Sequence, residues 1–304
     1  MVKQKADEPL FFTVIRILSY PSLRRPVLLC VKSIFYCFFF LQYKAALFPN
    51  RIPVSGVDHP LDKKIPFAPR WVKAYLDFVA FWIRLVGFLL RRYRRRGIGP
   101  AEDFITSIGK LYDFAAEVYT KNLSTTHRPR YLAHPRFLLI HAADPHLMCI
   151  PSLHVMIVIR AYTQFRAILR ALGEEGACAE KIAEVKRGAQ TITEAILFVK
   201  QHSINCIAAA MYAMSRFDGE LFPPIEAEDF ISGLFLSLPV PSPADRKIIG
   251  DYIMELYRRF LREGEGAPSW EEPLIAFLRT LPARQKNHSP GLKKMQIKSP
   301  GTRI

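Results

Sequence analysis

The stretch from Ile150 to Ile159 most constrains how this chain can fold. It begins with Pro-Ser-Leu-His at 151–154 and continues as an uninterrupted apolar run at 155–159. Proline ends the preceding segment, and serine is a favoured residue at the position that caps a helix. We therefore predict a helix that starts at Ser152. Its first turn presents backbone N–H groups, the Ser152 hydroxyl and the His154 ring, an arrangement that can bind an anion.

Helical periodicity recurs along most of the chain. Apolar residues at helical spacing predict further helices over 71–90, 100–120, 152–172, 179–214, 245–262 and 273–281. The helix over 179–214 has an alternative, namely two helices that meet near Lys200. The proline-containing stretches at 49–69 and 121–135 are predicted to be loops. The predicted fold class is all-α, a helical bundle.

Cysteine usage gives no sign of a covalent or metal-bound framework. The chain of 304 residues has five cysteines and 50% hydrophobic residues. No CxxC pair is present, and the cysteines are scattered along apolar stretches. We expect reduced, buried cysteines in a chain that can bury a large core.

The first hundred residues have features of a membrane-associated region. Residues 10–48 are dense in Phe, Leu, Ile and Tyr, but their uncharged part is shorter than the ~20 residues that a simple transmembrane helix needs. A transmembrane, re-entrant, interfacial or tightly packed helix would each fit. The aromatic helix at 71–90 ends in the basic cluster 91–96, which is typical of a membrane boundary or of a solvated helix end. We expect a membrane protein, at the cytoplasmic or inner membrane.

The charge balance restricts the class of partner. Lys and Arg number 43 against 27 Asp and Glu, a formal net charge of +16. Such a charge favours nucleic acid, an anionic lipid surface or a phosphate-bearing substrate. The long apolar runs favour an anionic membrane and a lipid phosphate over nucleic acid, and the sequence leaves the oligomeric state open.

Three segments carry side chains that bind or transfer phosphate. The loop 121–129 supplies the cations Lys121 and Arg128, and arginine can bind two phosphate oxygens at once. The second segment is the helix start that contains His154. In the third, His202 stands at the head of another apolar segment. Two histidines at helix starts allow one nucleophile and one general acid.

The order of these segments resembles a known family. Lys-x6-Arg-Pro at 121–129, Pro-Ser-x-His at 151–154 and the histidine at 202 resemble the type 2 phosphatidic acid phosphatase superfamily. This superfamily also includes vanadium haloperoxidases and sphingolipid headgroup transferases. The resemblance covers about residues 100 to 216 and is partial in the third motif. Where the family has an arginine and an aspartate around the nucleophile, this chain has Ile196 and Cys206.

The resemblance implies a role for each matching residue. Lys121, Arg128 and Ser152 would bind the substrate phosphate, and His154 would be the general acid. His202 would be the nucleophile that forms a phosphohistidine, which water or an acceptor alcohol then resolves. The implied activity is a lipid phosphatase or phosphotransferase that uses no metal and no other cofactor. Its substrate would be a lipid phosphate.

The apolar and polar patterns along the chain, together with the resemblance over about 100–216, predict a division into three regions. Residues 1–98 would form a hydrophobic, membrane-associated helical region, and residues 99–240 a phosphatidic acid phosphatase-like helical core. Residues 241–304 would form soluble C-terminal helices and a basic, disordered tail.

Other interpretations stay open beside this one. Asn205 would orient the nucleophile in place of the aspartate, and Lys200 would replace the arginine. Alternatively, the chain is a non-catalytic member of the same fold that binds lipid headgroups or acts as a membrane scaffold. The histidines and Asp144 between 127 and 154 could suggest a metal site, but their spacing matches no strong metal-binding signature.

Overall fold

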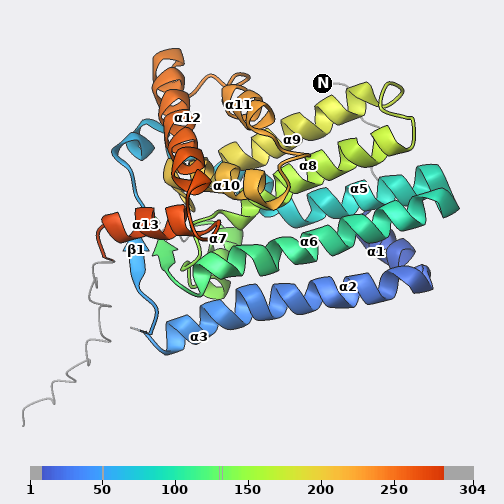
Figure 1. The fold of residues 1–304 in the computed structure, drawn as a ribbon, viewed down its shortest axis with the longest axis horizontal. Helices are drawn as coiled ribbons and strands as arrows, with labels where there is room; N and C mark the ends of the chain where they lie inside the picture. The colour runs from blue at the N-terminus through green and yellow to red at the C-terminus, as the bar shows by residue number, and fades with distance from the viewer. Residues whose placement is uncertain (1–8, 50, 130, 132, 284–304) are drawn as a thin grey trace, which may run out of the picture.

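The fold is helical along almost its whole length. The computed structural model of the chain describes residues 9–49, 51–129, 131 and 133–283 (Figure 1). Of these residues, 72% are in helices and 3% in strands, so the predicted all-α class is confirmed. The basic tail that the sequence predicts to be disordered lies outside the described residues.

The N-terminal helices form a long apolar run and an inner helical hairpin. They are α1 (Leu10–Ser19), α2 (Pro21–Ile34), a π-helical segment (Phe35–Phe40), α3 (Leu41–Leu47), α4 (Val72–Leu76), α5 (Phe78–Tyr93) and α6 (Ile98–Tyr119). Helices α2, α3 and the π-helical segment follow one another directly and run beside α6 (Figure 1). Short 3-10 turns lie at Pro60–Lys64, Pro69–Trp71 and Arg94–Gly97.

The remaining helices complete the bundle. They are α7 (Pro135–Ala143), α8 (Leu153–Ala171), α9 (Ala179–Phe198), α10 (Ile204–Phe217), α11 (Pro224–Ser232), α12 (Pro243–Glu265) and α13 (Glu272–Thr280). Of the two alternatives for residues 179–214, the structure has two helices. Their junction includes Lys200, whose φ of 55° lies in the left-handed region.

Helix α8 lies at the centre of the core. It contacts α5, α6, α9 and α10, and its residues from Val155 to Ile159 are all fully buried. An apolar run without charge is the composition expected of a helix that is covered on all sides. One hydrophobic cluster extends from Ile17 to Leu278. It includes side chains from each of the predicted regions 1–98, 99–240 and 241–304.

Two stretches that the sequence predicts to be loops contain short strands. Strand β1 (Val54–Gly56) pairs in parallel with β2 (Leu123–Thr125), with Ser55 opposite Ser124. Each strand has only three residues, too few to show an alternating pattern. Their pairing joins the segment after α3 to the end of α6.

Four of the five cysteines are buried, as the sequence predicts. Cys30, Cys149, Cys178 and Cys206 are buried and Cys37 is half-buried, and none forms a disulfide.

One helical stretch among the described residues could cross a membrane by length and composition. It spans Pro21–Leu47, has 27 residues and a mean hydropathy of 1.6, and only 17% of its apolar window is buried. The aromatic helix α5, in contrast, packs inside the bundle, where Leu85, Val86 and Leu89 are buried.

Candidate functional site

The segment that precedes α8 is fixed by buried hydrogen bonds. The Ser124 hydroxyl accepts the N–H groups of Cys149 and Ile150, at 3.1 and 2.7 Å. The Tyr119 hydroxyl donates to the carbonyl of Pro151, which follows a cis peptide bond. These contacts hold the Pro-Ser-Leu-His motif in one backbone conformation.

Ser152 occupies the cap position of α8, as the sequence predicts. Its side chain makes no capping bond, and its hydroxyl is fully buried with no hydrogen-bond partner among the described residues. A buried polar atom without a partner costs roughly 1–3 kcal/mol. The hydroxyl therefore remains able to bond a ligand at the start of the helix.

The structure brings His154 and His202 together from two helix starts. Their ring centroids lie 5.4 Å apart, with the rings inclined at 66°. His154 stacks on Tyr75 at 4.7 Å and contacts Phe78 at 4.2 Å. His202 interacts with the backbone of Cys149, and its Nδ1 is buried without a partner among the described residues.

A third histidine completes the group. The His146 ring lies 6.4 Å from that of His202, centroid to centroid, and we call His146, His154 and His202 the histidine cluster. His146 Nε2 lies 2.8 Å from the Thr126 hydroxyl, and its Nδ1 lies 3.7 Å from Asp144 Oδ2.

Burial keeps the histidine cluster neutral. It lowers the pKa of His154 to about 4 and lowers the pKa of His146 below its usual value. The pKa of His202 falls well below its usual value, first through burial and then because a protonated His154 or His146 would repel a second positive charge on His202. A neutral imidazole has a lone pair for nucleophilic attack or for accepting a proton.

Arg128 and Asp144 place opposite charges beside the cluster. Arg128 Nη1 lies 3.5 Å from Asp144 Oδ2 and 3.3 Å from Gln201 Oε1. Gln201 directly precedes His202 in the sequence. Burial raises the pKa of Asp144, but its hydrogen bond and charge interaction with His146, and the charge of Arg128, outweigh this effect. The pKa of Asp144 is therefore lowered.

Lys121 contacts a different part of the protein from Arg128 and the histidine cluster. Its ammonium group pairs with the carboxylate of Glu271, just before α13, and half of its side chain is exposed. The structure therefore brings Arg128, Ser152, His154 and His202 into one region and directs Lys121 to the C-terminal segment.

Lys200 and Asn205 also have other partners than His202. The Lys200 ammonium group donates to the carbonyls of Asp62 and Ile65. The Asn205 side chain donates to the carbonyl of Val57 at 3.1 Å and accepts from the Tyr252 hydroxyl at 2.6 Å. Both side chains anchor the α9–α10 junction to neighbouring segments and do not orient the histidine ring.

The sequence motifs predict no role in phosphate chemistry for Asp144 or His146. Asp144 is the only Asp, Glu, Lys or Arg between Phe137 and Ile159, which is an available signal for a functional carboxylate. His146, which it contacts, has a φ of +60° in the left-handed region, and no residue pattern predicts this conformation. Among the described residues, no group of three or more His, Cys, Asp or Glu side chains has the geometry of a metal site.

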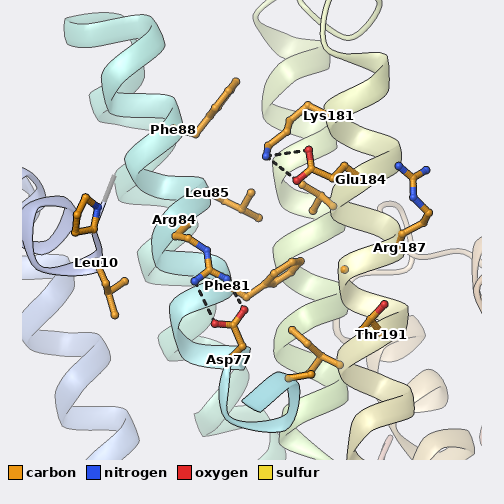
Figure 2. Close-up of a pocket in the computed structure, with 15 residues that line it drawn as sticks. Leu10, Asp77, Phe81, Arg84, Leu85, Phe88, Lys181, Glu184, Arg187 and Thr191 are labelled. Atoms are coloured by element: carbon orange, nitrogen blue, oxygen red, sulfur yellow. Dashed lines mark hydrogen bonds and ion pairs between the residues drawn. The ribbon is translucent and has the colours of Figure 1, made fainter. Parts of the chain in front are cut away.

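A cavity of about 620 Å³ lies elsewhere, between α1, α5 and α9 (Figure 2). Leu10 lines it from α1, and two ion pairs lie at its wall, Arg84 with Asp77 and Lys181 with Glu184. These cations are already paired with carboxylates, and no member of the histidine cluster lines the cavity. The cavity is therefore separate from the candidate site.

Comparison of the chain with known protein families, with curated proteins and with solved structures finds no match.

Proposed function

We propose that this chain hydrolyses or transfers the phosphate group of a lipid phosphate ester, at an anionic membrane, through a phosphohistidine. The observation that carries the proposal is the meeting of His154 and His202, which are 48 residues apart in sequence and 5.4 Å apart between ring centroids. The unpartnered Ser152 hydroxyl and His202 Nδ1 support it, because such buried polar atoms are free to form a hydrogen bond or a bond to a phosphate group.

The reaction proceeds in two displacement steps. His202 Nδ1 attacks the phosphorus, the bond to the lipid oxygen breaks, and His154 gives a proton to the departing alkoxide. Water or an alcohol then attacks the phosphohistidine, its proton passes to His154, and His202 is released. A covalent intermediate divides one difficult displacement into two easier ones.

The protonation states of the two histidines support these roles. His202 is neutral, as a nucleophile must be, because burial lowers its pKa. His154 is also neutral at rest, with a pKa of about 4. A phosphate dianion beside His154 favours the protonated ring and raises this pKa towards neutrality, so that substrate binding prepares the general acid.

Arg128 and Ser152 bind the phosphate, together with the backbone N–H groups at the start of α8. Arg128 already lies beside the cluster, and a bound phosphate would compete with Asp144 and Gln201 for its guanidinium group. The reaction requires no metal or other cofactor.

Asp144 takes the electrostatic role of the family's missing aspartate. It acts through His146, which contacts both its carboxylate and the ring of His202. A carboxylate in this place stabilises the positive charge that develops on the cluster when His202 is phosphorylated. Asp144 and His146 are thus positioning residues.

A second candidate function is the binding of a lipid headgroup without chemistry, or a scaffold role on the membrane. The pairing of Lys121 with Glu271 favours it, because one of the two cations of the resemblance is directed to another partner. The low exposure of His202, 8%, favours it as well.

Phosphate release separates the two functions. Purified protein is incubated without metal with phosphatidic acid, a polyprenyl phosphate or a sphingoid phosphate, and free phosphate is measured. We expect His154→Asn and His202→Asn each to lower the rate by roughly 10³-fold or more. His127→Asn, an exposed loop histidine, is the matched control and should retain the wild-type rate. Wild-type release no higher than that of the double variant would contradict the enzyme and favour headgroup binding.

A further inference from the structure

The exposed apolar side chains of this chain gather in one part of the fold. Of the 23 large hydrophobic side chains that the described residues leave exposed, 16 lie between Leu10 and Phe48. They include Leu28 at 69%, Phe35 at 54% and Phe39 at 41% exposure. Single exposed apolar residues are normal, but so many within one run of helices mark an interaction surface. We call the exposed face of α1, α2, the π-helical segment and α3 the N-terminal apolar face.

The charges on this face identify its partner. Residues 10–49 contain five basic side chains and no acidic one. Arg24 and Arg25 are exposed on α2, and Lys32 and Lys44 are exposed further along the run. Each Lys or Arg near an anionic lipid surface contributes about 1 kcal/mol of attraction. A second copy of the chain would bring like charges together on the same face, so an anionic bilayer fits better than self-association.

The neighbour of α2 determines how the face meets the bilayer. Helix α6 runs beside α2 (Figure 1), and its Asp113 carboxylate accepts from Ser33 at 3.1 Å and from the Cys37 thiol at 3.2 Å. Glu102, Asp103, Lys110 and Glu117 of α6 are exposed as well. If α2 crossed the bilayer in this packing, α6 would carry these charges into the hydrocarbon, at several kcal/mol each.

We propose that the N-terminal apolar face docks flat on an anionic bilayer, with the axis of α2 in the plane of the membrane. Helices that lie in this way bury their apolar face in the boundary between headgroups and acyl chains. Lys32 stands among the apolar residues of the face, and its long stem allows the ammonium group to reach the lipid phosphates.

The docked face extends to the candidate site. The Tyr43 hydroxyl donates to the carbonyl of Ala143 at 2.6 Å, and the N–H of Leu147 donates to Gln42 at 3.0 Å. Leu138 and Leu139 of α7, the helix that ends at Ala143, are also exposed. The ends of the segment that carries Asp144 and His146 are thus tied to α3. If the proposed function holds, a lipid phosphate reaches the histidine cluster from this side, whereas docking itself does not depend on catalysis.

Flotation with vesicles tests the docking surface. Full-length protein is mixed with phosphatidylcholine vesicles with and without phosphatidylserine. We expect binding to require phosphatidylserine and to weaken with salt. The triple variant Leu28→Ser, Phe35→Ser and Phe39→Ser should bind at least about tenfold more weakly. The control, Ile225→Ser with Leu236→Ser, removes two apolar residues that are 73% and 68% exposed outside the N-terminal apolar face, and it should bind like wild type.

Three results would overturn the proposal. One is equal vesicle binding by the triple variant and wild type, and another is a wild-type dimer that this variant dissociates, measured by light scattering.

The third concerns the orientation of α2 relative to the membrane. With Cys37→Ser as background, an impermeant thiol reagent outside sealed vesicles should label Ser22→Cys and Phe48→Cys equally, whereas a transmembrane helix would protect one of them. His202→Asn should bind vesicles like wild type, so a failure of catalysis leaves this proposal testable.

Discussion

Two buried polar atoms at the candidate site have no partner among the described residues, the Ser152 hydroxyl and His202 Nδ1. A folded protein tolerates such atoms at a cost, and they are usually found where a water, an ion or a substrate binds. Both lie at helix starts whose backbone is held by other contacts, as with Ser124 and the segment before α8. The backbone around the candidate site is therefore fixed by contacts within the protein.

Replacing Ser152 should separate stability from function. Ser152→Ala removes a buried hydroxyl that has no partner, so we expect the free energy of unfolding to stay the same or rise by roughly 1 kcal/mol. Phosphate release should fall by about 10²-fold or more, because one donor to the phosphate is lost. Urea unfolding and the phosphate-release assay measure the two effects. A less stable variant with full activity would contradict the assignment.

The lowered histidine pKa values predict a pH-dependent stability. The unfolded chain protonates its histidines near pH 6.5, whereas His154 in the folded chain does so only near pH 4. Stability should therefore be complete above pH 6.5 and fall as the pH is lowered towards 4. His154→Asn should show a shallower fall than wild type in urea unfolding at several pH values. Equal slopes would show that His154 is protonated in the folded chain.

At the scale of helices and strands, the sequence predicts what depends on local patterns. The helix predicted at 152–172 is observed at Leu153–Ala171, because a proline, a serine at the cap position and an apolar run are all local signals. The parallel pairing of β1 with β2 could not be predicted, since it joins residues about 70 positions apart. The contact of Asp144 with His146 could not be predicted for a different reason, because His146 has a left-handed backbone conformation that no residue pattern indicates.

The packing of α2 on α6 depends on a glycine. A Cβ atom on Gly109 would lie 3.2 Å from the Cα of Cys30, closer than ordinary packing allows. Gly109→Val should therefore push the two helices apart and lower the free energy of unfolding by about 1–3 kcal/mol. Gly99→Val, at a glycine of the same helix where a Cβ atom meets nothing within 4 Å, controls for the helix propensity of valine. An equal effect of both substitutions in urea unfolding would refute the close-packing explanation.

At the scale of the whole molecule, helical periodicity predicts the fold class and the net charge predicts a preference for anionic partners. It could not predict where the basic and apolar residues meet on the surface, because this depends on which helices cover each other. The aromatic helix at 71–90 looked as suited to a membrane as the N-terminal run, but α5 is covered by the bundle and α2 is not. The sequence motifs predict residues of the candidate site, such as His154 and His202, that lie together in the structure, whereas the partners of Lys121, Lys200 and Asn205 depend on the tertiary fold.

The phosphohistidine is the most direct test of the proposed function. Protein is incubated with phosphatidic acid that carries a labelled phosphate, quenched in alkali, and digested for mass spectrometry. We predict labelled phosphate on His202 in wild type and in His127→Asn, and none on His202→Asn. An unlabelled wild-type protein, or a label that persists in His202→Asn, would contradict phosphoryl transfer through this residue.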